Sequence, residues 1–137
     1  MLTLDKKTLH AMEAMLTIAG HTGTQPISGK EIAAEHELPP RYLEQMLQRL
    51  VRAELLRGVR GPRGGYVLAR EKRRISLADI LHATQADNDE DEDSRYDALS
   101  NLLSEIGDDI TEKLASVTLQ ELAPNKASDK KTADFAI

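Results

Sequence analysis

The chain has 137 residues and a net charge of −5, and its length suits one compact domain with one accessory element. It contains no cysteine, which excludes disulfides, thiolate metal sites and thiol catalysis; it also lacks a membrane-length apolar run and a signal-peptide pattern, so we expect a cytoplasmic protein without a membrane partner. The charge is unevenly divided: residues 1–86 contain 13 Lys and Arg against 9 Asp and Glu, whereas residues 87–137 contain 5 against 14, so only the first part attracts a polyanion.

The first part of the chain predicts three helices. Residues 4–20 carry apolar side chains at helical spacing. Ser28 and Glu31 form a capping-box pattern, which begins a second, short helix. Pro39 and Pro40 end that helix and open the third, because proline is tolerated in the first turn of a helix but not inside one. This order predicts a helix-turn-helix, although a generic helical hairpin would give the same pattern.

The third helix has two different faces. Its apolar face consists of Leu43, Met46, Leu47, Leu50 and Val51. Its other face carries planar side chains that form hydrogen bonds, namely Arg41, Gln45, Gln48, Arg49 and Arg52.

Two short β-type runs follow, at residues 55–59 and 66–69, and the Gly and Pro residues between them permit a tight reversal. Residues 41–74 contain 10 Lys and Arg against 3 Glu. A helix with an Arg and Gln face, followed by a hairpin with arginines at its tip, can place one element in a major groove and the other against a neighbouring groove. The sequence therefore predicts a winged helix-turn-helix that binds double-stranded DNA.

Beyond the hairpin, a basic patch is either a solvated loop or a set of phosphate contacts, and its members are Arg70, Lys72, Arg73 and Arg74. Ser76 and Asp79 repeat the capping pattern and begin another helix. Residues 87–93 carry six negative charges and predict a flexible linker. A calcium site remains the alternative there, although the spacing and the Gly of an EF-hand loop are missing.

A long helix is predicted after the linker, and Thr118 with Glu121 predicts a short terminal helix. The apolar positions of the long helix alternate three and four apart, as in a coiled-coil seam. Such a stripe either folds back on its own domain or pairs with a second copy, and the acidic linker favours pairing. The expected homodimer interface contains Tyr96, Leu99, Leu103, Ile106, Ile110, Leu114 and Val117.

We therefore expect a mainly α protein of the α+β class, a winged helix-turn-helix with a two-stranded β wing and a long C-terminal dimerisation helix. The predicted organisation is a DNA-binding domain at residues 1–86, an acidic flexible linker at 87–95, dimerisation and terminal helices at 96–123, and a disordered tail at 124–137.

With these elements in place, the chain resembles the BadM/Rrf-type family of bacterial winged-helix regulators, which includes IscR, NsrR and CymR. The similarity covers roughly residues 1–122 and depends on a tyrosine-led helix placed a fixed distance before a Gly-rich hairpin tip. The motifs that carry it are Ile32-Ala33, Tyr42-Leu43-Glu44-Gln45, Val59-Arg60-Gly61-Pro62, Gly64-Gly65-Tyr66 and Ile75-Ser76-Leu77-Ala78-Asp79-Ile80.

The resemblance implies a homodimer that binds palindromic operators, with the third helix in the major groove and the hairpin loop in the minor groove. By motif position, Glu44 and Gln45 are the base-reading pair and Arg60 is the wing arginine. The chemistry agrees, since Gln suits adenine, Glu accepts from cytosine and Arg suits a narrow minor groove. The expected phosphate contacts, which set affinity more than sequence preference, are Arg41, Gln48, Arg49, Arg52, Arg57 and Arg63.

The chain departs from the family pattern in three places. Pro39 and Pro40 replace small hydroxyl residues, and Arg63 replaces a Gly. Members of the family that sense through an iron–sulfur cluster supply cysteines, whereas Asp97 and Ser100 lie near those positions here, and neither replaces a thiolate. We therefore expect no cluster, no other cofactor and no metal.

The resulting hypothesis is a dimeric, sequence-specific transcriptional regulator of the repressor type. The alternative is a winged-helix protein-interaction module that has lost sensing, either with or without the loss of DNA binding. An enzyme is not expected, because the chain has no phosphate-cradling Gly loop and no His clustered with carboxylates. The signal is left open between a small molecule, a protein partner and no effector.

Overall fold

The computed structural model describes residues 4–21, 25–85 and 95–123. The predicted linker and its alternative calcium site lie almost wholly outside these residues, and so does the predicted tail at 124–137. The elements, in chain order, are α1 (Lys6–Gly20), α2 (Gly29–Glu35), α3 (Pro40–Arg52), β1 (Leu56–Val59), β2 (Gly65–Leu68), the 3-10 turn η1 (Lys72–Arg74), α4 (Leu77–Gln85), α5 (Asp97–Ala115) and α6 (Leu119–Leu122).

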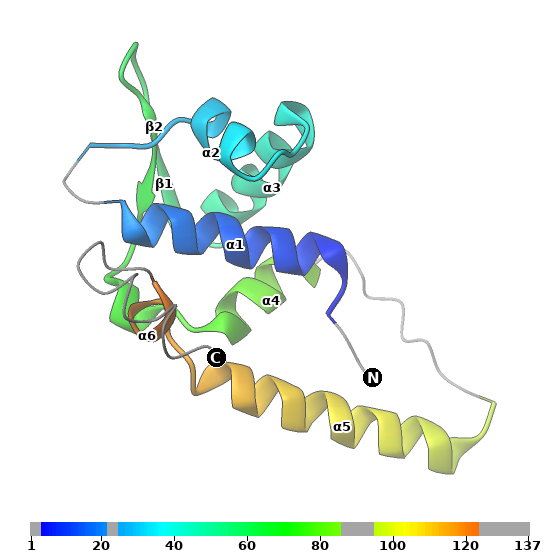
Figure 1. The fold of residues 1–137 in the computed structure, drawn as a ribbon. Helices are drawn as coiled ribbons and strands as arrows, with labels where there is room; N and C mark the ends of the chain where they lie inside the picture. Colours follow the sequence, from blue (N-terminus) through cyan, green and yellow to red (C-terminus); the bar gives the residue numbers. More distant parts are fainter. Residues whose placement is uncertain (1–3, 22–24, 86–94, 124–137) are drawn as a thin grey trace, which may run out of the picture.

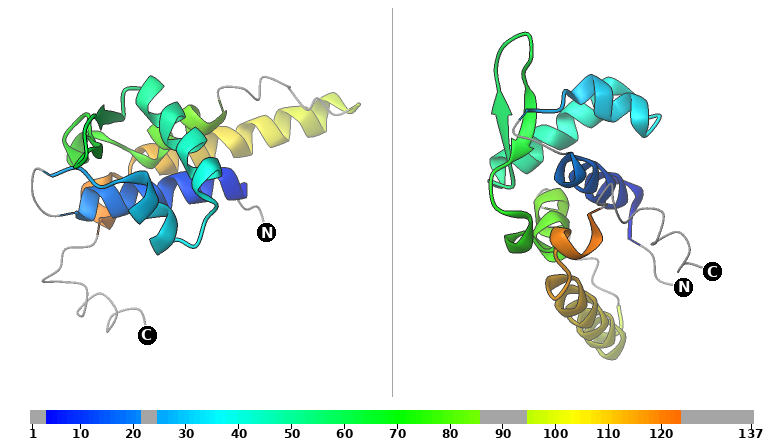
Figure 2. Two further views of the ribbon diagram at one scale, coloured as in Figure 1. Left: turned by 90° about the horizontal axis from the view of Figure 1, so that it is seen from above. Right: turned by 60° about the vertical axis from the view of Figure 1, so that its left-hand side comes forward.

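Helix α1 crosses the middle of the molecule, with α2 and α3 on one side of it and α4 and α6 on the other (Figure 1). The β hairpin rises beside α2 and α3, and its tip projects beyond them (Figures 1 and 2). The predicted fold class is confirmed: the molecule is mainly helical and contains a two-stranded antiparallel sheet.

Three helices begin at capping side chains, of which Ser28 and Ser76 were predicted and Asp5 was not. Asp5 accepts a hydrogen bond from the backbone N–H of Thr8 at 2.8 Å, and this bond holds the pKa of Asp5 below its usual value. Ser28 caps α2 by accepting from the Glu31 amide at 3.2 Å. At α4 the capping box is reciprocal, because Ser76 and Asp79 each accept from the other's backbone N–H, at 3.1 and 2.9 Å.

Helices α2 and α3 both end in a left-handed residue that is a glutamate, not a glycine. Glu37 has φ 53° and Glu54 has φ 62°. After Glu54, the N–H of Leu55 donates back to the Leu50 carbonyl at 3.0 Å, and Leu55 itself is buried. This Schellman arrangement turns the chain from α3 into the hairpin.

Strands β1 and β2 pair antiparallel from Leu56 opposite Leu68 to Val59 opposite Gly65, within one residue of the predicted runs. The sequence did not predict a third participant: the backbone of Ile27 exchanges hydrogen bonds with Tyr66, at 3.2 and 2.8 Å. Gly65 has φ +157°, and a Cβ there would collide with the Ile27 carbonyl. Glycine at this position therefore allows the segment before α2 to join the hairpin.

The core lies between α1, α3, α4 and the base of the hairpin, and its fully buried side chains include Met15, Ile32, Leu43, Leu47, Leu50, Leu55, Leu56, Ile75, Ile80 and Leu119. A polar contact also crosses this core. Thr84 donates its hydroxyl proton to the Leu81 carbonyl at 2.9 Å, so it accepts from the buried hydroxyl of Thr8 at 2.8 Å. This bond joins the start of α1 to the end of α4.

Helix α5 runs along the bottom of the molecule and projects away from it (Figure 1). It contacts α4, and none of its residues is buried. The helix is slightly shorter than predicted, because Tyr96 is its N-cap and Val117 lies after its end. None of the helices in the described ranges is both long enough and apolar enough to cross a membrane.

The segment after α5 returns to the main body. The Leu77 N–H donates to the Val117 carbonyl at 3.0 Å, and the Leu119 N–H donates to the Ile75 carbonyl at 2.9 Å. The predicted terminal helix exists as α6, but the side chain of Thr118 makes no capping hydrogen bond. Thr118 instead pairs with Ser76 in an isolated β-bridge, which fixes α6 against the start of α4.

Candidate nucleic-acid interface

Helix α3 presents a polar stripe opposite its buried face. The exposed members of this stripe recur at three- and four-residue spacing, so they lie one above another along the helix. They are Arg41, Gln45, Gln48 and Arg52. Glu44 and Arg49 lie on the two flanks of the stripe, and each of them has a partner in a neighbouring element.

On one flank, Glu44 is held by the hairpin. The Tyr66 hydroxyl donates to Glu44 Oε2 at 2.7 Å and accepts from Gln48 Nε2 at 3.3 Å. Burial of Tyr66, together with its bond to the Glu44 carboxylate, raises the pKa of Tyr66 to about 12. A Cβ at Gly29, the first residue of α2, would collide with the Glu44 side chain. Glu44 is therefore fixed between α2 and the hairpin.

On the other flank, Arg49 faces α4. Its Nη1 donates to the carbonyl of Thr84 at 3.2 Å, in the last turn of that helix. The side chain is half-buried, in contrast to the exposed Arg52. Arg49 therefore links α3 to α4, a contact that the sequence pattern did not indicate.

A groove of about 640 Å³ separates α3 from the hairpin. Its lining comes from three elements: the start of α2, the outer side of α3 and the hairpin loop. Among the lining residues are Lys30, Gln48 and Arg60. Arg57, Arg60 and Arg63 are all exposed on the hairpin, but of these three predicted wing cations only Arg60 lines this groove.

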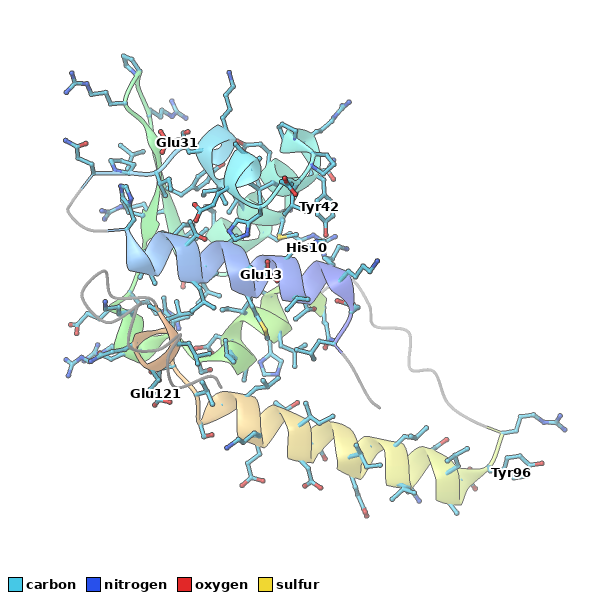
Figure 3. The ribbon with its side chains drawn as sticks, in the orientation of Figure 1. His10, Glu13, Glu31, Tyr42, Tyr96 and Glu121 are labelled. Carbon is cyan, nitrogen blue, oxygen red and sulfur yellow. The ribbon has the colours of Figure 1, made fainter. Side chains whose placement is uncertain are left out.

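The start of α3 is fixed to α1. His10 Nδ1 lies 2.9 Å from the Tyr42 hydroxyl, and the two rings meet edge to face with their centroids 5.6 Å apart. Figure 3 shows the two side chains between these helices. Burial, with a smaller contribution from the Asp5 carboxylate, raises the pKa of Tyr42. Tyr42 therefore positions α3, which explains the tyrosine in its motif.

The basic patch lies away from the hairpin tip. It follows the end of β2, at the base of the hairpin, where η1 packs against α6 (Figure 1). Within it, Arg73 Nε donates to Glu71 Oε2 at 2.6 Å, and this bond lowers the pKa of Glu71. Arg70 faces Asp79 of α4 instead, at 3.9 Å.

Both the sequence and the fold resemble those of known proteins. Residues 4–125 match the Rrf2 family, described as an iron-dependent transcriptional regulator. The transcriptional regulator IscR of Sodalis glossinidius is 33% identical over 131 residues, which cover 90% of this chain and 79% of that protein. CymR of Bacillus subtilis is 32% identical over 139 residues, covering 98% and 99%. The structure of T. potens IscR aligns with a TM-score of 0.76 at 32% identity, over 95% of this chain and 90% of that chain.

The chain belongs to the Rrf2 family of transcriptional regulators. The family resemblance drawn from the sequence is thereby confirmed, and with it the winged-helix, DNA-binding character of the protein. Its matched relatives are named as regulators and not as enzymes, in agreement with the sequence analysis.

The iron dependence in the Rrf2 description does not fit the side chains of this member. A cysteine-ligated cluster needs thiolates, and the chain has no cysteine. Asp97 is exposed in the first turn of α5, and Ser100 lies one turn further on, so neither offers a soft ligand. Within residues 4–21, 25–85 and 95–123, no three His, Asp or Glu side chains are grouped to hold a metal ion.

The structure adds two residues to the predicted interface. Lys30 lines the groove from α2, and the Tyr66 hydroxyl holds Glu44 and Gln48. Tyr66 was visible in the sequence as part of the Gly-Gly-Tyr motif, but its partner was not. For Lys30, the only signal in the sequence that it lies near the interface was its place two residues after the capping Ser28.

Proposed function

We propose that this Rrf2-family member is a homodimeric repressor that binds palindromic operators. The observation that carries the proposal is the continuity of the polar stripe on α3 with the groove that leads to Arg60 on the hairpin. A helix face of this kind fits a major groove, and an adjacent arginine loop can reach the neighbouring minor groove.

The proposed roles follow from where the side chains lie. Gln45 is at the centre of the exposed stripe and reads a base, while Arg60 enters the minor groove. Glu44 also reads a base, and its bond with Tyr66 supports this role because it fixes the carboxylate before DNA arrives. Phosphates are contacted by Arg41, Gln48, Arg52, Arg57 and Arg63, whereas Arg49, the sixth predicted phosphate contact, faces α4.

Dimerisation is proposed to occur through α5. Apolar side chains in its first half are exposed in the single chain, with Leu99 at 44%, Leu102 at 52% and Leu103 at 47%. Later along the helix, Ile106, Ile110 and Leu114 are half-buried. Tyr96, at the end of α5 that projects furthest, is 71% exposed (Figure 3). Pairing would bury this stripe and set two α3 helices about 34 Å apart, one helical turn of DNA. A dimer on such a site would occlude a promoter, which accounts for repression.

The test compares a proposed base contact with a proposed phosphate contact. Gln45→Ala should weaken operator binding by about 1–3 kcal/mol and relax base preference, as should Arg60→Ala, whereas Arg52→Ala should weaken cognate and random DNA alike and lower the salt slope by about 1. Operators selected from random duplexes would supply the cognate DNA, and fluorescence anisotropy at several salt concentrations would measure binding.

The matched control is Glu54→Asp, a change in the turn after α3 that keeps the local charge and lies outside the stripe and the groove. It should leave binding unchanged. If Gln45→Ala weakened cognate and random DNA equally, its base-reading role would be wrong. If the wild type bound no duplex at low salt, the DNA-binding role itself would be wrong.

A further inference from the structure

A second cavity lies behind the polar stripe of α3, between α3, α4 and the segment that follows β2. Its volume is about 480 Å³, within the range of sites for small organic molecules. The cavity is separate from the groove between α3 and the hairpin, and the two share no lining residue. Its lining consists of Arg49, Arg52, Ala53, Leu55, Arg70, Asp79, His82 and Ala83.

The cavity has an excess of positive charge. Three guanidinium groups from two directions line it: Arg49 and Arg52 from the last turns of α3, and Arg70 from the end of the hairpin. One carboxylate, that of Asp79, opposes them. This carboxylate already accepts from the Ser76 N–H at 2.9 Å and faces Arg70 at 3.9 Å. The lining has three guanidinium groups against one carboxylate, so an anion is the ligand that its field favours.

The apolar part of the lining distinguishes a free organic anion from a DNA phosphate. Ala53, Leu55 and Ala83 line the same cavity as the arginines. A phosphodiester gains nothing from apolar contacts, whereas Asp79 repels either anion and does not distinguish them. Arg49 is also turned away from the outer stripe, toward the Thr84 carbonyl at 3.2 Å. A carboxylate on a short apolar body would satisfy both parts of the lining.

We propose that this cavity binds a small organic anion, an apolar carboxylate, which acts as an effector of DNA binding. Its effect on DNA rests on the proposed function, whereas the binding site itself does not. The ligand would pair with Arg52, one of the proposed phosphate contacts, and would tie it to Arg70 and α4. An arginine neutralised in this way can no longer contact a DNA phosphate, so the ligand lowers the affinity for DNA. By linkage, DNA lowers the affinity for the ligand by the same factor.

The binding test uses hexanoate as the probe, adipate to add a second carboxylate and hexanamide as the neutral analogue. Full-length protein would be titrated at constant ionic strength while the methyl NMR signals of Ala53, Leu55 and Ala83 are followed. Hexanoate and adipate should shift these signals, and hexanamide should not. Arg70→Gln should weaken binding about tenfold, the loss of one charge-assisted hydrogen bond.

The matched control is Arg73→Gln, which removes the same charge three residues away but outside the cavity, and it should bind like the wild type. No methyl shift up to about 50 mM, far above a millimolar Kd, would overturn the site. Equal losses in Arg70→Gln and Arg73→Gln would overturn it too, because they would indicate general charge screening.

DNA binding is tested separately. Saturating hexanoate should lower wild-type affinity for duplex DNA and reduce the salt slope by about 1, and it should do neither in Arg52→Gln. If the anion bound and the protein bound DNA, but neither changed the other's affinity, the effector role would be overturned. If the protein bound the anion but no DNA, the proposed function would fail while the site stood. DNA without hexanoate could also shift the same methyl signals. If it did, and if Arg70→Gln lowered the affinity for DNA, the cavity would hold a backbone phosphate and the free-anion proposal would be wrong.

Discussion

Tyr66 makes three separate contacts. Its backbone pairs with Ile27 before α2, its hydroxyl donates to Glu44 on α3, and the same hydroxyl accepts from Gln48. The side chain is 8% exposed, so these bonds lie at the edge of the core and are only partly screened by water. One residue therefore sets the distance between the hairpin, α2 and α3, and thus the width of the groove.

The raised pKa of Tyr66 predicts a dependence of stability on alkaline pH. The unfolded chain should release this proton near pH 10, whereas the folded chain retains it until about pH 12. Folding stability from this group is therefore complete below pH 10 and is lost as the pH rises from about 10 to about 12. Urea unfolding across this range should show a decline for the wild type that is smaller for Tyr66→Phe.

Tyr42→Phe is the control, because the pKa of Tyr42 is also raised but no hairpin contact depends on its hydroxyl. It should leave most of the alkaline decline in place. An equal decline in the wild type and in Tyr66→Phe would contradict the assignment to Tyr66.

At the scale of elements, one leucine of α6 is fully buried in the core. Leu119 is fully buried among the core residues, whereas Leu122, one turn later, is 48% exposed. Leu119→Ala should therefore lower the free energy of unfolding by about 2–5 kcal/mol, through lost burial and the cavity left behind. Leu122→Ala should cost less than about 1 kcal/mol. Urea denaturation would measure both, and similar costs would mean that α6 does not dock as described.

The left-handed end of α3 gives a second prediction at this scale. Glu54 has φ 62°, a conformation that is strained for any residue with a Cβ. Glu54→Gly should therefore raise the free energy of unfolding by about 0.5–1 kcal/mol. Glu35→Gly, at a helical position in α2, is the control and should lower it by a similar amount, since glycine disfavours helix. A loss of stability in both variants would show that Glu54 is not strained.

Local signals predicted the helices and the hairpin, because each of these elements depends on residues that are neighbours in the chain. The capping pair at Ser76, the two prolines at the start of α3 and the glycines of the hairpin all mark their elements correctly. Contacts between distant segments left no such signal. The pairing of Ile27 with Tyr66 and that of Ser76 with Thr118 are backbone bonds, which almost any side chain permits.

The same limit applies to the candidate interface. Helical spacing predicts which residues share the outer stripe of α3, but it cannot predict which neighbouring elements the residues beside the stripe contact. Glu44 and Arg49 both looked exposed and polar in sequence, yet one turns toward the hairpin and the other toward α4. The partners of flanking residues depend on tertiary packing, and only the fold supplies them.

On the whole molecule, most cationic residues and most exposed apolar side chains lie on different elements. Residues 41–74, with 10 Lys and Arg against 3 Glu, form the hairpin, most of α3 and the basic patch. The exposed apolar stripe is on α5, which carries acidic residues on its other positions. Two copies that pair through α5 would keep their cationic surfaces free, so a single charge on α5 can test the assembly without touching the proposed DNA surface.

Leu103→Glu should convert the proposed dimer into a monomer, because it places a charge in the centre of the apolar stripe. Ser104→Glu adds the same charge at the next residue, which points about 100° away around the helix, and should remain dimeric. Sedimentation at several concentrations would measure the masses, and anisotropy would measure binding to a two-half-site operator. Binding should weaken strongly in Leu103→Glu, since linked half-sites raise the effective concentration of the second domain. If both variants dissociated, the added negative charge would explain the loss of the dimer, and the apolar stripe would not be its cause. A wild type that is monomeric would exclude pairing through α5.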